Sequence, residues 1–190
     1  MKLGRIKALC KARQYVELFD RRDGKQFLSD GCGVWPVDEK LPLTEEVVRT
    51  IFEITTRKWS ENWSFQHIRF GEDDDAENCG MPECLLEDFW APGTETELMT
   101  TRERILMMGE ELQLFATADG QERYLWASTE QFSACPDNAR LFALRTAPDT
   151  TRAIAVYDDM FLGGLIRVLG TGQQLQIANT LRGLSEKEVI

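Results

Sequence analysis

Hydrophobic and polar positions repeat along the chain in two matched segments. A Leu-Phe pair at 18–19 precedes an Asp-Gly pair at 23–24, and a second Leu-Phe pair at 114–115 precedes Asp-Gly at 119–120. An aromatic-leucine pair follows each Asp-Gly pair. Asp-Gly is favoured in tight hairpin turns, so each copy predicts a strand, a turn and a returning strand. The matched spacing favours an internal duplication, although any two antiparallel hairpins share some of these features.

The remaining apolar spacing predicts further strands and about three helices. Helices are expected from Thr44 to about residue 54 and at 171–183, with a single helical turn at 128–132. Residues 1–13 fit a short amphipathic helix, and a strand is the alternative there. A third hairpin joins two apolar arms around Asp158-Asp159, and Gly163-Gly164 predicts a bulge or a close backbone approach in its second arm. Other strands are predicted at 34–37, 63–70, 84–90, 104–108 and 141–145.

These elements predict an α+β fold with antiparallel, hairpin-rich sheets. The Pro92-Gly93-Thr94 interruption is the best candidate for a boundary between two similar halves, 1–93 and 94–190, packed as one compact unit. A single continuous sheet and a sheet-on-sheet sandwich both remain open. Pro36 indicates that the strand at 34–37 lies at a sheet edge.

Charge is concentrated in one segment. The formal net charge is -10, and residues 72–88 hold most of it without a single basic residue. No broad basic face for nucleic acid is present, and the acidic segment reads as a solvated loop or a site for a basic partner. No run approaches the roughly 20 apolar residues of a membrane helix, and the basic N-terminus lacks the apolar core of a secretion signal. We therefore expect a cytoplasmic protein with no membrane partner.

Candidate metal chemistry is confined to one grouping. His67, Cys79 and Cys84 are the closest set of zinc-ligand types, and Asp75 or Glu77 would have to complete it. The alternation from Asp73 resembles the start of a calcium loop, but asparagine and cysteine occupy its sixth and twelfth positions.

Catalytic motifs are missing from the sequence. His67 is the single histidine, and there is neither a nucleophile elbow nor a phosphate loop. The five cysteines follow no framework and are expected to be reduced. We therefore expect no catalytic residue and no cofactor.

Five tryptophans are candidates for the core or for an interface: Trp35, Trp59, Trp63, Trp90 and Trp126. Trp59 and Trp63 are four residues apart beside Arg57 and Lys58, so a helix would place them on one face. We take Trp59, Trp63 and the acidic residues Asp73, Asp74 and Asp75 as candidate protein contacts.

Short segments at both ends of the chain carry a family resemblance. Lys-Ala-Leu-Cys-Lys-Ala at 7–12, Val-Glu-Leu-Phe-Asp at 16–20, Ser-Asp-Gly at 29–31 and the segment 152–161 together resemble small uncharacterised proteins encoded by phages and prophages. That resemblance implies a phage-related, intracellular setting. It implies no activity and no functional residue.

Three hypotheses follow. The first is a non-catalytic intracellular protein that binds another protein, with aromatic anchors for affinity and the acidic segment for steering. The second is an accessory factor of DNA metabolism with clamp-like duplicated halves, in which Arg5, Lys7 and Lys11 would face the DNA backbone. The third, with the least support, is a metal-dependent enzyme built on His67, Cys79 and Cys84.

Overall fold

The strands of this chain form one continuous mixed sheet. The computed structural model describes residues 2–37, 42–54, 63–72, 80–89, 95–107, 109–122, 125–139 and 141–169. Within them the ten strands run in the order β4-β1-β2-β3-β10-β9-β8-β5-β6-β7. Their bounds are β1 Tyr15–Asp20, β2 Gln26–Ser29, β3 Gly33–Pro36, β4 Ser64–Arg69, β5 Thr96–Met107, β6 Glu110–Thr117, β7 Leu125–Ser128, β8 Leu141–Thr146, β9 Arg152–Asp158 and β10 Phe161–Arg167.

Three α-helices and one 3₁₀ helix accompany this sheet within the described residues. They are α1 (Leu3–Arg13), α2 (Glu45–Ile51), α4 (Thr129–Phe132) and the 3₁₀ helix η2 (Glu83–Leu86). The Thr44 hydroxyl accepts a hydrogen bond from the Val47 amide at the start of α2, as its sequence predicts. The predicted α+β class and the three predicted hairpins are confirmed. Of the two sheet arrangements that the sequence leaves open, the structure has the continuous sheet.

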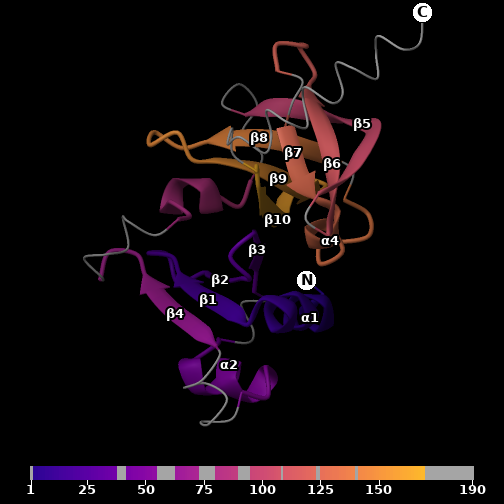
Figure 1. The fold of residues 1–190 in the computed structure, drawn as a ribbon. Coiled ribbons are helices and arrows are strands. Elements are labelled where there is room, and N and C mark those ends of the chain that lie inside the picture. The colour runs from indigo at the N-terminus through magenta and orange to yellow at the C-terminus, as the bar shows by residue number, and fades with distance from the viewer. Residues whose placement is uncertain are drawn as a thin grey trace, which may run out of the picture.

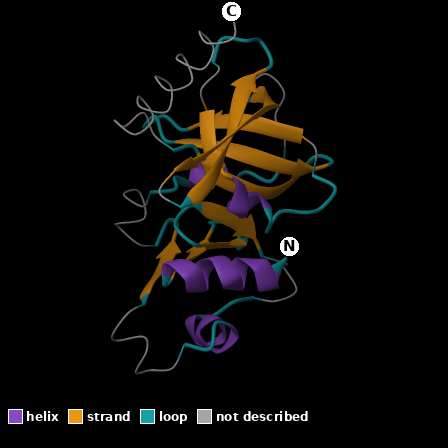
Figure 2. Cartoon of the chain, turned by 45° about the vertical axis from the view of Figure 1, so that its right-hand side comes forward, coloured by secondary structure: helices purple, strands orange, loops and turns teal. Residues whose placement is uncertain are grey.

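All neighbouring strands are antiparallel except β1 and β4, which run parallel. The connection between β3 and β4 includes α2, which suits the long crossover that parallel pairing requires. Figure 1 shows β1 to β4 with α1 and α2 in the lower part of the molecule and β5 to β10 in the upper part. Figure 2 shows α1 lying beside the lower strands.

The upper part of the sheet curls back on itself. The Leu169 amide, just after β10, donates a hydrogen bond of 2.9 Å to the Trp126 carbonyl of β7. β7 is the last strand of the sheet, so this bond brings one end of the sheet against the chain that leaves its middle. Closure of this kind protects an edge that would otherwise present free backbone groups.

Buried apolar side chains cover both faces of the sheet. The first core cluster joins residues of α1 and α2 to one face, including Ile6, Leu18, Val48, Trp35 and Val156. The second core cluster lies on the other face and includes Phe19, Val34, Leu85, Tyr157 and Leu165. Burial on both faces explains why the arms of the β9–β10 hairpin read as continuous apolar runs, as expected for central strands.

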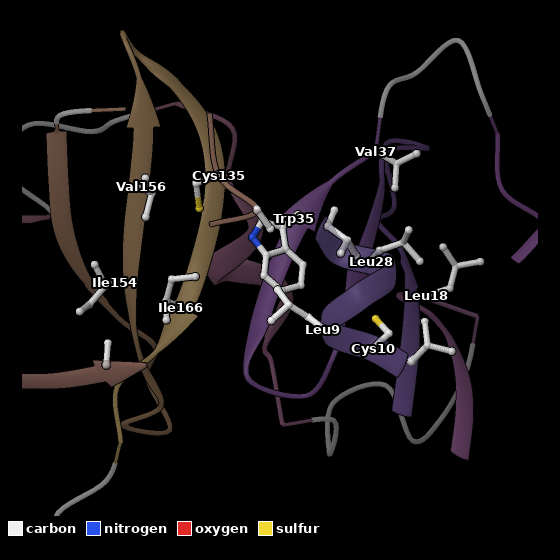
Figure 3. Packing of buried hydrophobic residues seen from close by; sticks show 14 of the residues in the cluster. Leu9, Cys10, Leu18, Leu28, Trp35, Val37, Cys135, Ile154, Val156 and Ile166 are labelled. Atoms are coloured by element: carbon white, nitrogen blue, oxygen red, sulfur yellow. The ribbon is translucent and has the colours of Figure 1, made fainter. Parts of the chain in front are cut away.

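The indole of Trp35 joins the two parts of the sheet. Figure 3 shows its ring between Cys135 and Ile166 on one side and Leu9 and Leu28 on the other. A Cβ at Gly164 would lie 2.8 Å from Trp35 Cδ1 and 2.8 Å from Cys135 Sγ, so only glycine allows this approach. The register also shifts between Leu162 and Gly164. The predicted bulge and the predicted close approach are thus both present.

Two local predictions are wrong. The segment predicted as a strand at 84–90 contains η2, and Phe89 alone makes an isolated bridge. Pro36 does not mark a sheet edge, because β3 pairs with both β2 and β10. Proline is tolerated there because β10 pairs only with Gly33 and Val34, so the missing amide of Pro36 interrupts no bond to β10.

Both copies of the repeated segment are hairpins, but their matched residues face different cores. Leu18 belongs to the first core cluster and Phe19 to the second, whereas Phe115 belongs to the first and Leu114 to a third, small cluster. The boundary at 93–94 and the helix at 171–183 lie outside the described residues. Two similar halves therefore stay a prediction.

Candidate interaction surface

Three large apolar side chains are exposed together where the β9–β10 turn meets the segment that follows η2. Phe89, Met160 and Phe161 are 55%, 54% and 62% exposed, and we call these three residues the Phe89–Phe161 patch. The two phenyl rings have centroids 5.3 Å apart and are tilted by 51°. Single exposed apolar residues are ordinary, but a contiguous group of this kind is typical of a binding surface.

Paired backbone fixes the position of the patch. Met160 lies in the turn between β9 and β10, where Asp159 adopts a left-handed φ of 54° and Phe161 pairs with Asp158. Phe89 forms an antiparallel bridge with Phe161, and the Leu162 amide donates a 2.7 Å hydrogen bond to the Asp88 carbonyl. The patch is therefore held in place before any partner binds.

Arg145 of β8 ties the segment that carries Phe89 to the sheet. Its Nη1 donates to the carbonyls of Leu85 and Glu87, and its Nη2 donates to the Phe89 carbonyl and the Tyr157 hydroxyl. Nε donates to Glu95 over 2.8 Å. All five guanidinium hydrogens thus have an acceptor, which is what a buried arginine requires.

Tyr157 completes this buried network. Its hydroxyl donates to Glu95 Oε2 over 2.5 Å, and its ring lies 5.5 Å from the Arg145 guanidinium carbon. Burial, and then the hydrogen bond to Glu95, raise the pKa of Tyr157 above its ordinary value. The hydroxyl therefore stays protonated and remains a donor across the physiological pH range.

Acidic residues stand next to the patch residues in the chain. Glu87 and Asp159 are exposed and Asp158 is half-buried. Arg21 Nη1 lies 3.7 Å from Glu87, whereas Asp158 and Asp159 form no ion pair with any described residue. An apolar centre with an acidic rim is complementary to a partner that presents an apolar side chain among lysines or arginines.

The contacts predicted from the sequence fall partly outside the described residues. Trp59, Asp73, Asp74 and Asp75 are not among them. Trp63 is half-buried and packs against the first core cluster, next to β4. These five residues stay a prediction as a protein-binding set.

The predicted metal ligands that are described do not form a cluster. His67 Nε2 lies 2.7 Å from Asp20 Oδ2, and Nη2 of Arg69 donates to His67 Nδ1 over 3.1 Å, so the ring proton is on Nε2. Cys84 is exposed on η2, and partial desolvation of its sulfur, followed by the charges of its acidic neighbours, raises the pKa of the thiol. Cys79 lies outside the described residues, and within them no three His, Cys, Asp or Glu side chains gather as metal ligands would.

Acidic partners neutralise much of the basic N-terminal helix. Glu53 accepts from both Lys7 and Lys11 over 2.8 Å, and these hydrogen bonds and charges lower the pKa of Glu53 to about 2. Arg13 Nε lies 3.1 Å from Asp30 Oδ2. Of the three residues predicted to face DNA, Arg5 alone makes no ion pair with a described residue.

Sequence reasoning missed the Phe89–Phe161 patch. The sequence feature that could have revealed it is the apolar pair Met160-Phe161 directly after Asp158-Asp159, because the residues of a hairpin turn are normally polar. Phe89 could not be added from sequence, because its approach to Phe161 depends on tertiary structure.

The four described cysteines, Cys10, Cys32, Cys84 and Cys135, are free thiols. No described helix has the length and apolar character needed to cross a membrane. Compared with known proteins, the chain matches no family model, no curated protein and no solved structure.

Proposed function

We propose that this chain is a non-catalytic protein-interaction protein that binds a basic partner through the Phe89–Phe161 patch. One observation carries the proposal: three apolar side chains, each more than half exposed, lie together on backbone that is already ordered. Phenylalanine and methionine are enriched at interfaces, and a preorganised site loses little conformational entropy on binding.

The charges around the patch support a basic partner. Glu87, Asp158 and Asp159 border it, and the whole chain carries a net charge of -10. Charge complementarity of this kind raises the association rate more than it raises affinity. We therefore expect binding to a basic partner to weaken as salt concentration rises.

A role in binding DNA receives less support. Lys7 and Lys11 both pair with Glu53, so the helix offers little free positive charge to a phosphate backbone. The resemblance to phage-encoded proteins favours an intracellular partner and a bacterial lysate as its source.

The test is crosslinking in a bacterial lysate, with and without nuclease treatment, followed by reconstitution with the purified crosslinked protein. Phe161→Ser removes the most exposed ring of the patch. Leu106→Ser is its matched control, because Leu106 is 77% exposed on β5 and lies outside the patch. We expect Phe161→Ser to abolish binding and Leu106→Ser to preserve it. Equal binding by both variants, or loss of binding after nuclease treatment, would overturn the proposal.

A further inference from the structure

A polar cavity lies between α1, β1 and β10, away from the Phe89–Phe161 patch. Its volume is about 470 Å³, within the range of small-molecule sites. Arg13, Tyr15, Glu17, Asp30, Cys32 and Arg167 are the polar side chains that matter most in its lining. The cavity is open to solvent on one side, and four of these six side chains carry an acidic or guanidinium group. We therefore ask which of these charges are compensated within the protein.

The charge of Asp30 is compensated within the protein. Its Oδ1 accepts from the amides of Cys32 and Gly33, over 3.0 and 2.8 Å. Its Oδ2 accepts from Gln131 Nε2 over 3.0 Å and lies 3.1 Å from Arg13 Nε. Arg13 also pairs with Glu110 over 2.8 Å. Asp30 and Arg13 therefore hold the β2–β3 loop between α1 and α4, and their charges need no ligand.

Glu17 has hydrogen bonds but no cation. Its carboxylate accepts from the Tyr15 hydroxyl over 2.6 Å and from the Ser29 hydroxyl over 2.7 Å. The residue is 3% exposed, and no described lysine, arginine or histidine pairs with it. A buried carboxylate without a counter-charge is costly, so a ligand that brings a positive charge next to it would be bound favourably.

Arg167 is the opposite case. No described carboxylate pairs with its guanidinium, and its Nε is buried without any hydrogen-bond partner. The guanidinium rests against Gly80, where an added Cβ would lie 2.8 and 2.9 Å from Nη2 and Nη1. The Arg167 amide donates to the Cys32 carbonyl over 2.8 Å, which fixes the start of this side chain at the cavity wall. A guanidinium placed in this way suits a carboxylate, to which it can donate two parallel hydrogen bonds.

Among the described residues, one cavity thus holds a carboxylate without a cation and a guanidinium without an anion, and these two groups do not pair with each other. We propose that the cavity binds a small zwitterion of the amino-acid type, with the ligand carboxylate on Arg167 and the ligand ammonium beside Glu17. Each ligand charge would then meet the protein charge that lacks a partner. The inference does not depend on the proposed protein-binding function.

Calorimetric titration of the purified protein with the protein amino acids tests the proposal. For an amino acid that binds, two analogues are titrated next, one lacking the amino group and one lacking the carboxylate. Each analogue is expected to bind at least about tenfold more weakly, because one buried charge is again left unpaired. Failure of every amino acid to bind at millimolar concentration would overturn the proposal, and so would equal binding of either analogue.

Variants locate the site. Glu17→Gln removes the negative charge but keeps an acceptor for one of the two hydroxyls, of Tyr15 and Ser29, and a donor for the other. Arg167→Gln removes the guanidinium. Each variant is expected to weaken amino-acid binding at least about tenfold. Gly80→Ala retains both charges but displaces the guanidinium, and it should weaken binding as well. Arg104→Gln, on exposed β5, is the matched control. Undiminished binding by Arg167→Gln would overturn the assignment, whereas Phe161→Ser should leave amino-acid binding unchanged.

Discussion

The Arg145 network offers a direct test of how the segment carrying Phe89 is held. Replacing Arg145 by methionine keeps an unbranched apolar chain of similar reach but removes all five hydrogen bonds of the guanidinium. Glu95 still accepts a hydrogen bond from the Tyr157 hydroxyl but loses its ion-pair partner. Three backbone carbonyls lose the guanidinium as their hydrogen-bond donor. Arg145 and Glu95 are both almost fully buried, so solvent cannot replace the lost partner.

The size of the effect follows from this geometry. A net loss of about 1 kcal/mol for each ordinary hydrogen bond, and more for those to charged groups, exceeds what methionine packing returns. Removing one partner of a buried ion pair costs about 3–5 kcal/mol. We expect Arg145→Met to lower the free energy of unfolding by about 3–5 kcal/mol. That is a large share of the roughly 5–15 kcal/mol that is typical of a domain.

Urea unfolding followed by circular dichroism measures the change, with the transition midpoint and slope fitted for each variant. Arg152→Met is the matched control, since it removes an arginine whose partner, Glu122, lies at the surface. It should cost at most about 1 kcal/mol. Equal losses in the two variants would refute the role assigned to Arg145. A further variant, Arg145→Met with Glu95→Leu, should regain part of the loss because no charge is then left buried and unpaired.

Three further outcomes are expected. Gly164→Ala should destabilise the protein by about 1–3 kcal/mol in urea unfolding, because its methyl group would collide with Trp35 and Cys135. Gly4→Ala, in the first turn of α1 with open space around it, is the control and should not destabilise the protein. The folded-state pKa of Glu53 is lowered from 4.5 to about 2, so its contribution is present above pH 4.5 and is lost as pH falls toward 2; unfolding midpoints measured across that window should decline less steeply for Glu53→Gln than for the wild type. Thr44→Ala should lower the free energy of unfolding by about 1 kcal/mol through loss of the cap on α2, and no change in the urea midpoint would contradict that contact.

Local structure could be predicted from the sequence far better than the arrangement of strands. The Asp-Gly turns at 23–24 and 119–120 predicted their hairpins because turn chemistry acts over a few residues. Thr44 predicted the start of α2 for the same reason. The segment at 84–90 failed because its conformation depends on distant residues: three of its carbonyls bind the Arg145 side chain.

The candidate sites depend even more on contacts between distant parts of the chain, which the sequence does not predict. Glu17 and Arg167 are far apart in the chain, and no spacing rule relates them, yet both line one cavity. Phe89 and Phe161 likewise meet only through a bridge between distant segments. Residues such as Trp63 and His67 attract attention because of their residue type. Arg167 matters because no described carboxylate pairs with it, and that can be judged only in three dimensions.

The position of β10 in the sheet has a consequence for synthesis of the chain on the ribosome. β10 is the last of the described strands in sequence but lies in the middle of the sheet, where it joins β3 to β9. Its contact with β3 consists of the pairs Leu165–Val34 and Ile166–Gly33, which are among the most distant in the chain. Contacts of such long range form slowly. β3 therefore stays unpaired on one side, and the Trp35 ring lacks its neighbour Gly164, until residue 166 has left the exit tunnel. A nascent chain stalled before that point would expose an aggregation-prone edge at β3.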